Sequence, residues 1–449
     1  MKNVVLAETE PMNRANPISR RRFLRRSSIV LGAALAAPTI IPASALGADG
    51  ATAPSERINM GCIGVGGQGT RGMAGGIWVQ ASGGFLGRKD IQVRAVCDVD
   101  RRHRNHARNL VNARYGNHDC ATYDRFEELL ARPDIDALLI ATGERWHPLI
   151  SIAAAEAGKD IYCEKPMSLT IAEPLALRSV VRRCGVIYQN GTQQRSSHAF
   201  RFACELVRNG YIGQVKEVVV GVGGPVAFQE CDLPAQPAPD YLDYDRWLGQ
   251  VPWRPYNAGF VGGWMAYRDC SGGEMTNWGA HHFDCAQWGL GMDNSGPVEI
   301  IPPDGKDHTV LTYRYADGVI MTRDPDRLQR ESGQGNGLMF VGTEGKVAVW
   351  RWQFRTWPEH LARQKIGPGQ IHLHKADDHH ADFIHSIRTR VRPGGDVAVG
   401  ARSITVCHLG NLAYELGRAV RWNPETEQFV NDPEAQRLMS RHMRSPWHL

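Results

Sequence analysis

Apolar and polar positions in the first half of the chain follow one repeating pattern. Short apolar runs, typical of buried strands, alternate with segments that have apolar residues at helical spacing. Strands that alternate with helices predict a parallel sheet, and ligands bind beyond the carboxyl ends of such strands. The expected strands are Ile58–Val65, Ile91–Cys97, Ala137–Ile140 and Asp160–Cys163, the expected helices are Phe126–Leu130 and Leu149–Ala157, and the segments at strand ends are Thr142–His147 and Glu164–Pro166.

The second half mixes helices and strands without this alternation. A chain of 449 residues exceeds one ordinary domain, so two are expected. The expected elements are a helix at Phe200–Arg208, a strand at Val215–Val222, a hairpin from Val310–Tyr315 and Val319–Thr322, and a long helix at Ile404–Leu416. A loop rich in Pro, Asp and Tyr, Ala227–Trp253, is expected to wall a site.

The N-terminus carries the pattern of a twin-arginine export signal. Ser19–Arg25 contains consecutive arginines, and the apolar run Ile29–Ile41 is too short to span a bilayer. Ala43–Ala45 is a small-x-small cleavage site, so residues 1–45 are predicted to be a signal peptide. The alternatives are an uncleaved anchor or a fortuitous arginine cluster. Export by the twin-arginine machinery, which moves folded proteins, predicts a periplasmic or otherwise exported enzyme.

Charge narrows the class of partner. The net charge is +5, and residues 1–45 hold seven Lys and Arg against two Glu, so the whole excess lies in the signal. A neutral mature chain has no electrostatic footprint for nucleic acid or for anionic lipid, and no membrane contact is expected after cleavage. The cysteines that lie in apolar strand-like runs, Cys62, Cys97 and Cys163, are expected to be free and buried.

A glycine-rich loop follows the first expected strand. Gly64 allows a tight turn, Gly66 lets the backbone approach a pyrophosphate, and Gly69 lets helix and strand pack closely. Amides at the N-terminus of the following helix would face the phosphates. The sequence therefore predicts a dinucleotide site, and the expected contacts are Gly64, Gly66, Gly67, Gln68 and Gly69.

Asp98, at the end of the second expected strand, indicates which dinucleotide binds. A carboxylate there can accept hydrogen bonds from the adenosine ribose hydroxyls and would repel a 2′-phosphate, so NAD is favoured over NADP. Arg101 and Arg102 follow closely and weaken that preference. The spacing from Gly69 to Asp98 is longer than usual, and Gly75–Lys89 is interpreted as a loop insertion.

Glu164-Lys165-Pro166 at a strand end, after this glycine loop, resembles the Gfo/Idh/MocA family, which contains glucose–fructose oxidoreductases, inositol dehydrogenases and related sugar dehydrogenases. The resemblance runs from about Arg57 to the C-terminus, and Cys163–Leu169, Asn190–Arg195 and Ser271–Asp293 are similar to its exported branch. It implies an α/β fold with a Rossmann domain at 55–190 and a domain with a large, open, mostly antiparallel sheet at 191–449. It also implies a homodimer or homotetramer.

The resemblance also assigns a catalytic pair. The lysine matching Lys165 lies near the substrate hydroxyl and the nicotinamide, where burial and the cationic ring would lower its pKa and suit proton exchange with a carbinol. The family histidine matches His281, which would donate or accept a proton. Asn277, His281 and Asp284 share a helix face and are expected on the substrate side.

Asn277 replaces the aspartate that is usual in the family. An amide can orient a hydroxyl but cannot take a proton. Three interpretations stay open: Lys165 and His281 carry the proton alone, Asn277 only binds substrate, or the site is impaired.

Further residues are assigned by position. Thr142, Glu144, His147 and Glu164 are expected to line the cofactor pocket, although Glu144 and His147 could instead serve the start of a helix. His147 and Arg195 are also candidates for substrate binding, with a structural hydrogen-bonding role as the alternative for Arg195. No metal site is expected, because no tight carboxylate or cysteine partner follows the usual metal-ligand pattern near the C-terminal histidines. They are interpreted as solvated residues at a charged helix start: His372, His374, His379, His380 and His385.

Export constrains the reaction, because no pool of free cofactor exists outside the cytoplasm. The enzyme is expected to hold NAD tightly and restore it in every turnover. One scheme oxidises a sugar or cyclitol and then reduces a second carbonyl compound. The alternative is a redox-neutral glycosidase that oxidises, eliminates and reduces, with an extra base among Tyr267, Glu274 and His147. A sugar-binding protein without turnover is the third hypothesis.

Overall fold

The computed structural model describes residues 52–76, 83–226 and 232–449. The chain divides into two units, Met1–Pro54 and Ser55–Leu449, and the elements below belong to the second, which begins within a short 3-10 turn at Pro54–Glu56. The predicted signal at residues 1–45 lies outside the described residues, as do parts of the two loops predicted at Gly75–Lys89 and Ala227–Trp253. Among the described helices, none has the length and apolar character needed to cross a bilayer.

The first domain is built on a parallel sheet, as the alternation of elements predicts. Its six described strands lie in the order β3-β2-β1-β4-β5-β6, and every neighbouring pair is parallel. This is the order of a dinucleotide-binding Rossmann sheet. The strands are β1 (Ile58–Ile63), β2 (Ile91–Cys97), β3 (Ala121–Tyr123), β4 (Ala137–Ile140), β5 (Asp160–Cys163) and β6 (Tyr188–Asn190).

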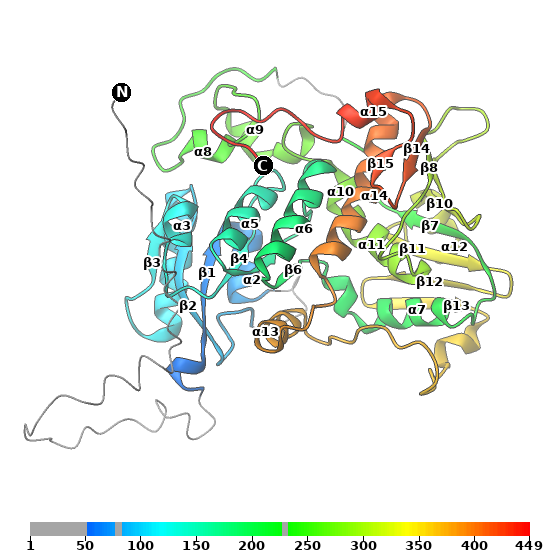
Figure 1. The fold of residues 1–449 in the computed structure, drawn as a ribbon, viewed down its shortest axis with the longest axis horizontal. Coiled ribbons are helices and arrows are strands. Elements are labelled where there is room, and N and C mark those ends of the chain that lie inside the picture. The colour runs from blue at the N-terminus through cyan, green and yellow to red at the C-terminus, as the bar shows by residue number, and fades with distance from the viewer. Residues whose placement is uncertain (1–51, 77–82, 227–231) are drawn as a thin grey trace, which may run out of the picture. The chain divides into compact units, whose positions relative to one another are not determined.

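Helices connect these strands and cover the sheet (Figure 1). All residues of β4 and β5 are buried, which is typical of strands covered on both faces. Asp100 caps α3 by accepting the Arg102 amide, and Gly116 ends the helix in the left-handed conformation. The helices are α2 (Gly67–Ala74), α3 (Arg101–Tyr115), α4 (Phe126–Leu130), α5 (His147–Glu156) and α6 (Ala172–Cys184).

The second domain contains a mostly antiparallel sheet of nine described strands. Their order is β13-β12-β11-β7-β10-β9-β8-β14-β15, and only the β7–β10 pair is parallel among the described pairs. The predicted hairpin is confirmed, because β9 and β10 pair antiparallel. The strands are β7 (Val215–Gly221), β8 (Glu299–Ile301), β9 (Leu311–Arg314), β10 (Ile320–Arg323), β11 (Gly337–Gly342), β12 (Lys346–Trp350), β13 (Gln353–Trp357), β14 (Val420–Asn423) and β15 (Gln428–Phe429).

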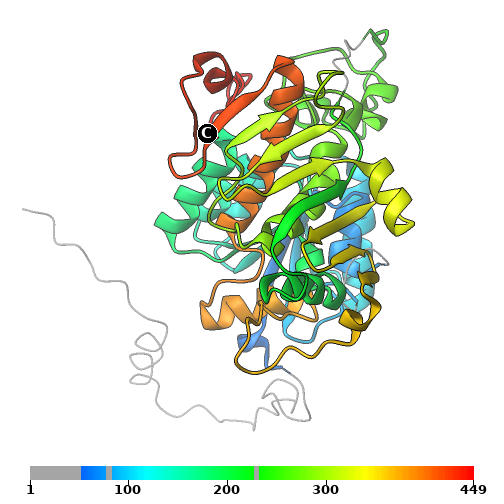
Figure 2. The ribbon, with the colours of Figure 1, turned by 90° about the vertical axis from the view of Figure 1, so that its right-hand side faces the viewer.

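Three long helices pack against this sheet, and one of them, α14, also packs against α6 of the first domain. They are α7 (His198–Arg208), α11 (Gly279–Leu290) and α14 (Val397–Leu416), and Figure 2 looks onto the sheet with α14 behind it. The helix predicted at Ile404–Leu416 is the second part of α14. The remaining described helical segments are α8 (Tyr244–Leu248), α9 (Ala258–Gly262), α10 (Glu274–Asn277), α12 (Pro325–Ser332), α13 (His379–Thr389), α15 (Pro433–Arg437), η3 (Gln193–Ser196), η4 (Trp264–Ala266) and η5 (Glu359–Arg363).

Helix α13 corrects the interpretation of the C-terminal histidines as solvated. His379 and His380 are buried, and His380 stacks on Phe85 of the first domain with ring centroids 3.8 Å apart. His379 Nε2 lies 3.1 Å from the Asn190 carbonyl oxygen. His385 is exposed, as predicted. The described residues contain no group of three or more potential metal ligands, and the nine cysteines among them are free.

Candidate active site

The glycine loop joins β1 to α2, and its glycines serve two different purposes. Gly64 has a φ of +77°, and a Cβ on Gly69 would lie 1.9 Å from the Gly64 carbonyl oxygen, so the fold requires both. A Cβ on Gly66 would have its nearest neighbour in the His103 ring at 3.5 Å, and Gly67 has nothing within 4 Å. Gly66 and Gly67 therefore leave open space at the N-terminus of α2, where an anion is favoured.

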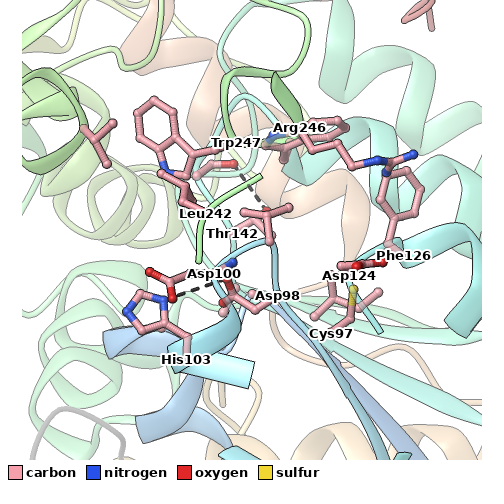
Figure 3. A pocket seen from close by; sticks show the side chains of 18 of the residues that line it. Cys97, Asp98, Asp100, His103, Asp124, Phe126, Thr142, Leu242, Arg246 and Trp247 are labelled. Carbon is pink, nitrogen blue, oxygen red and sulfur yellow. Dashed lines mark hydrogen bonds and ion pairs between the residues drawn. The ribbon is translucent and has the colours of Figure 1, made fainter. Parts of the chain in front are cut away.

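A pocket of about 420 Å³ opens beside this loop, at the carboxyl ends of β1, β2 and β4 (Figure 3). Gly66, Gly67 and Gln68 line it, together with Asp98 and Thr142. Side chains of the second domain close its other side: Tyr241, Leu242, Arg246, Trp247, Tyr256, Val261 and Trp264. Sequence reasoning found the first group from the glycine pattern, and only the expectation of a walling loop anticipated the second.

Asp98 follows β2 and is buried at the pocket edge. Its Oδ1 accepts the Asp100 amide at 2.8 Å and lies 3.8 Å from His103 Nδ1. Carboxylates of this kind accept hydrogen bonds from ribose hydroxyls. The open glycine backbone, the helix N-terminus and this carboxylate surround one pocket at the point where the strand order reverses between β1 and β4. These residues fit a dinucleotide.

Lys165, the second residue after β5, contacts Asn277 at the end of α10. Lys165 Nζ donates a hydrogen bond of 2.7 Å to Asn277 Oδ1, and Asn277 Nδ2 donates one of 3.1 Å to Glu274 Oε1. The amide thus stands between an amine and a carboxylate. Burial, reinforced by the nearby Arg351 charge, lowers the pKa of Lys165, while the carboxylates around it oppose that change.

His281 lies on α11 and is 1 % exposed. Arg351 Nη2 donates to its Nε2 at 3.3 Å, which requires the proton of the neutral imidazole to lie on Nδ1. Burial, then the charges of Lys165 and Arg351, hold the pKa of His281 well below its usual range. Its buried Nδ1 has no hydrogen-bond partner among the described residues, so this atom can donate to a ligand.

Arg351 is a site residue that sequence reasoning missed. It follows β12, is separated by 70 positions from His281, and its guanidinium lies 4.5 Å from the Trp278 ring centroid. Its local sequence is that of an ordinary arginine in a strand connection, so no local pattern could have identified it.

Glu144 lies beneath the segment that carries Asn277. Its Oε1 accepts the Gly272 amide and its Oε2 accepts the Thr276 hydroxyl, both at 3.1 Å. Burial raises the pKa of Glu144 to about 7. Glu144 therefore ties the loop after β4 to the second domain.

Glu164 and His147 fix the segment that carries Lys165 through hydrogen bonds. Glu164 is buried, and its Oε1 accepts Gln193 Nε2 at 3.0 Å. His147 is the first residue of α5, and its Nδ1 donates to the Pro166 carbonyl oxygen at 2.6 Å. Burial lowers the pKa of His147 to about 4, so this imidazole is neutral and fixes the turn that follows Lys165.

Arg195 and Asp284 are brought to each other and not to Lys165. Arg195 Nε donates to Asp284 Oδ2 at 2.8 Å, and Arg195 Nη2 donates to Asp293 Oδ1 at 2.7 Å. The Ser403 hydroxyl donates to Asp284 Oδ1 at 2.6 Å. These contacts favour the structural alternative for Arg195 over direct substrate binding. The ion pair fixes α11, which carries His281.

Comparison with known proteins agrees with this geometry. Residues 58–192 match the Gfo/Idh/MocA description "Oxidoreductase family, NAD-binding Rossmann fold". Residues 206–449 match the description "Oxidoreductase family, C-terminal alpha/beta domain".

Individual relatives cover parts of the chain. A 2,7-anhydro-N-acetylneuraminate hydratase of Mediterraneibacter gnavus is 34% identical over 267 residues, 58% of this chain and 56% of that protein. The myo-inositol 2-dehydrogenase of Thermotoga maritima is 25% identical over 229 residues, 49% of this chain and 58% of that protein. A glycosyl hydrolase family 109 protein of Saccharopolyspora erythraea is 30% identical over 222 residues, 45% of each chain. The chain thus spans only about half the length of these curated relatives.

Solved structures share the fold. Myo-inositol 2-dehydrogenase from Lactobacillus plantarum superposes with a TM-score of 0.55 at 18% identity, over 81% of this chain and 99% of that one. Scyllo-inositol dehydrogenase from Lactobacillus casei, with bound NAD(H) and scyllo-inositol, gives 0.54 at 15% identity over the same shares.

Proposed function

Because the chain belongs to the Gfo/Idh/MocA oxidoreductase family, we propose that it is an NAD-dependent dehydrogenase-type enzyme acting on a carbinol of a sugar, cyclitol or glycoside. The observation that carries this proposal is the pairing of Lys165 with Asn277 beside the neutral His281. The substrate class is supported by relatives named as inositol and anhydro-sugar enzymes.

Lys165, Asn277 and His281 have different roles in the proposed transfer of the carbinol proton. When bound, NAD supplies the hydride acceptor. Lys165, whose pKa is lowered by burial, takes the proton of the carbinol hydroxyl as hydride leaves the carbon. Asn277 aims the amine through its hydrogen bond, and His281 Nδ1 donates to the substrate oxygen or to a neighbouring hydroxyl. The first of the three interpretations of Asn277 is therefore the one proposed.

Retention of the cofactor is the second part of the proposal. The twin-arginine pattern at residues 1–45 supports export, and an exported enzyme has no supply of fresh cofactor. We propose that NAD, favoured over NADP by Asp98, stays bound and is restored within each catalytic cycle. A homodimer or homotetramer is proposed for the assembly, to be checked by light scattering.

The direct test is mass spectrometry of the small molecules released when the purified, exported protein is denatured. Stoichiometric NAD or NADH is the expected result. If the protein has an intact glycine loop and releases no nucleotide, the proposed retention of NAD is contradicted. That result would favour a binding protein or an enzyme that works before export.

A redox-neutral glycosidase is the second candidate. It is favoured by the relatives named as a hydratase and as a glycosyl hydrolase family 109 protein. This scheme needs a base for a carbon-bound proton, and Glu274, whose carboxylate contacts the Asn277 amide, suits it. His147 does not, because it is buried against the Pro166 carbonyl. Turnover of a glycoside in deuterated water decides: deuterium on the carbon next to the oxidised carbinol supports elimination, and its absence supports simple dehydrogenation.

A further inference from the structure

One segment of the second domain, residues 240–264, reaches over the dinucleotide pocket and is called the clasp below. Its first residues pair with the loop after β2: the Arg101 amide donates to the Tyr241 carbonyl at 2.8 Å, and the Asp243 amide donates to the Val99 carbonyl at 3.1 Å. The Arg102 guanidinium lies 3.5 Å from the Tyr241 ring centroid. Figure 1 shows α8 and α9 of the clasp at the top of the first domain. The clasp is thus attached to both sides of the pocket.

Arg145, on the loop after β4, is enclosed between the clasp and the pocket. It is 3 % exposed, and its Nη2 donates to the Trp247 carbonyl at 2.7 Å. Its guanidinium carbon lies 4.4 Å from the Trp247 ring and 5.5 Å from the Trp264 ring. Nε and Nη1 are buried and have no hydrogen-bond partner among the described residues.

Arg145 differs from the other arginines that line the pocket, because each of those is paired with a carboxylate. Among the arginines that line the pocket, Arg102 pairs with Asp100 and Arg246 pairs with Glu127. No carboxylate of the described residues forms an ion pair with Arg145. A guanidinium stays protonated when buried, and a buried charge needs a paired charge or hydrogen bonds. Aromatic faces supply only part of that stabilisation.

The backbone next to Arg145 makes room for its guanidinium. A Cβ on Gly143 would lie 2.8 Å from Arg145 Nη1. The same pocket is lined by Gly66 and Gly67, whose open backbone suits a phosphate. A guanidinium binds phosphate oxygens through paired hydrogen bonds. A diphosphate in this pocket would therefore accept hydrogen bonds from Nε and Nη1 of Arg145.

We propose that Arg145 binds the diphosphate of the dinucleotide and that the clasp, by holding Arg145 through the Trp247 carbonyl, slows release of the nucleotide. The inference rests on the dinucleotide of the proposed function and adds the residue that retains it. The clasp and Arg145 together supply the retention that an exported enzyme needs.

The test compares two ligands on the full chain freed of bound nucleotide. ADP-ribose carries the diphosphate, whereas adenosine lacks it. Arg145→Met is expected to weaken ADP-ribose binding about 10- to 100-fold, the loss typical of hydrogen bonds to charged groups, and to leave adenosine binding unchanged. Arg145→Lys, which retains the charge, should lose less. Calorimetry measures both affinities.

Arg132→Met is the control, because it removes an arginine of the first domain that pairs with Asp134 and does not line the pocket. Its ADP-ribose affinity should stay near that of the parent. If Arg145→Met weakens adenosine and ADP-ribose binding equally, the assignment of Arg145 to the diphosphate is overturned. A residue that only maintains the shape of the pocket would affect both ligands. A parent protein that binds neither ligand would overturn the proposed function itself.

Release is measured separately, by chasing bound NAD with labelled NAD. Trp264→Ala removes one aromatic face of Arg145 and keeps the Trp247 carbonyl. Faster exchange in Trp264→Ala and in Arg145→Met supports the clasp. An exchange rate unchanged in both variants would overturn it.

Discussion

The exchange Asn277→Asp restores the residue that is usual in the family and tests how the proton is moved. Lys165 Nζ lies 2.7 Å from Asn277 Oδ1, so the carboxylate would meet the amine directly. A negative charge at this position stabilises the ammonium form, which raises the pKa of Lys165. An ammonium cannot accept the carbinol proton, so the variant should need a higher pH to become active.

The size of the effect follows from the distance. Two unit charges about 4 Å apart attract by about 4 kcal/mol at an effective dielectric constant near 20. Glu164, Glu144 and Glu274 already act on Lys165 in the same sense, which reduces the added effect. Opposite charges at this range typically move a pKa by about one to three units. The acidic limb of kcat/KM should move to higher pH by that amount, and the rate on this limb should fall about tenfold per unit.

The assay is the pH profile of kcat/KM with the substrate identified by product analysis, supported by an NMR titration of the Lys165 amine. Glu274→Gln is the matched control with the opposite sign. Its carboxylate raises the pKa of Lys165, so its removal should move the same limb to lower pH. Limbs that stay in place, or that move in the same direction in both variants, would refute Lys165 as the base. Activity that appears only in Asn277→Asp would favour the sugar-binding hypothesis.

Four further substitutions test the residues around this site. Gly66→Ala should lower the amount of retained NAD and leave the unfolding free energy of the nucleotide-free protein unchanged. Gly69→Ala should destabilise the protein, because its Cβ would lie 1.9 Å from a backbone oxygen. Urea unfolding and nucleotide content distinguish the two effects. Glu144→Gln should remove a pH-dependent loss of stability: the pKa of Glu144 is raised to about 7, so the parent should lose up to about 3 kcal/mol relative to the variant as pH rises from about 4.5 through 7. Equal pH slopes in urea unfolding would contradict this. Arg195→Met should lower the unfolding free energy by about 3–5 kcal/mol, because it strands the buried Asp284 carboxylate. A raised KM without loss of stability would instead make Arg195 a substrate contact.

Sequence predicted the parts of the site that local patterns determine. The glycine loop, the acidic residue after β2 and the lysine after β5 each lie at the end of a strand whose apolar run is visible in the sequence. Gly64 and Gly69 are required by the backbone itself, which explains why the spacing alone identified the turn. The parallel sheet followed from the alternation of elements for the same reason.

Contacts between distant segments could not be predicted. Arg351 reaches His281 across 70 positions. Helix periodicity predicted one shared face for Asn277, His281 and Asp284, but Asn277 lies on α10 and the other two on α11. Only the fold shows that the partner of Asp284 is Arg195. The solvated interpretation of His380 was wrong because its burial depends on Phe85, nearly 300 residues earlier in the chain.

Two adjacent side chains, Glu144 and Arg145, attach the loop after β4 to different segments of the second domain. Glu144 is held by the Gly272 amide of the segment that carries Asn277, whereas Arg145 is held by the Trp247 carbonyl of the clasp. The loop after β4 is thus secured by two separate segments of the second domain. Neither Trp247 nor Trp264 belongs to the 271–277 segment, so Glu144 and Arg145 contact different parts of the second domain. This separation supports the proposed cycle, in which NAD stays bound while the substrate is exchanged.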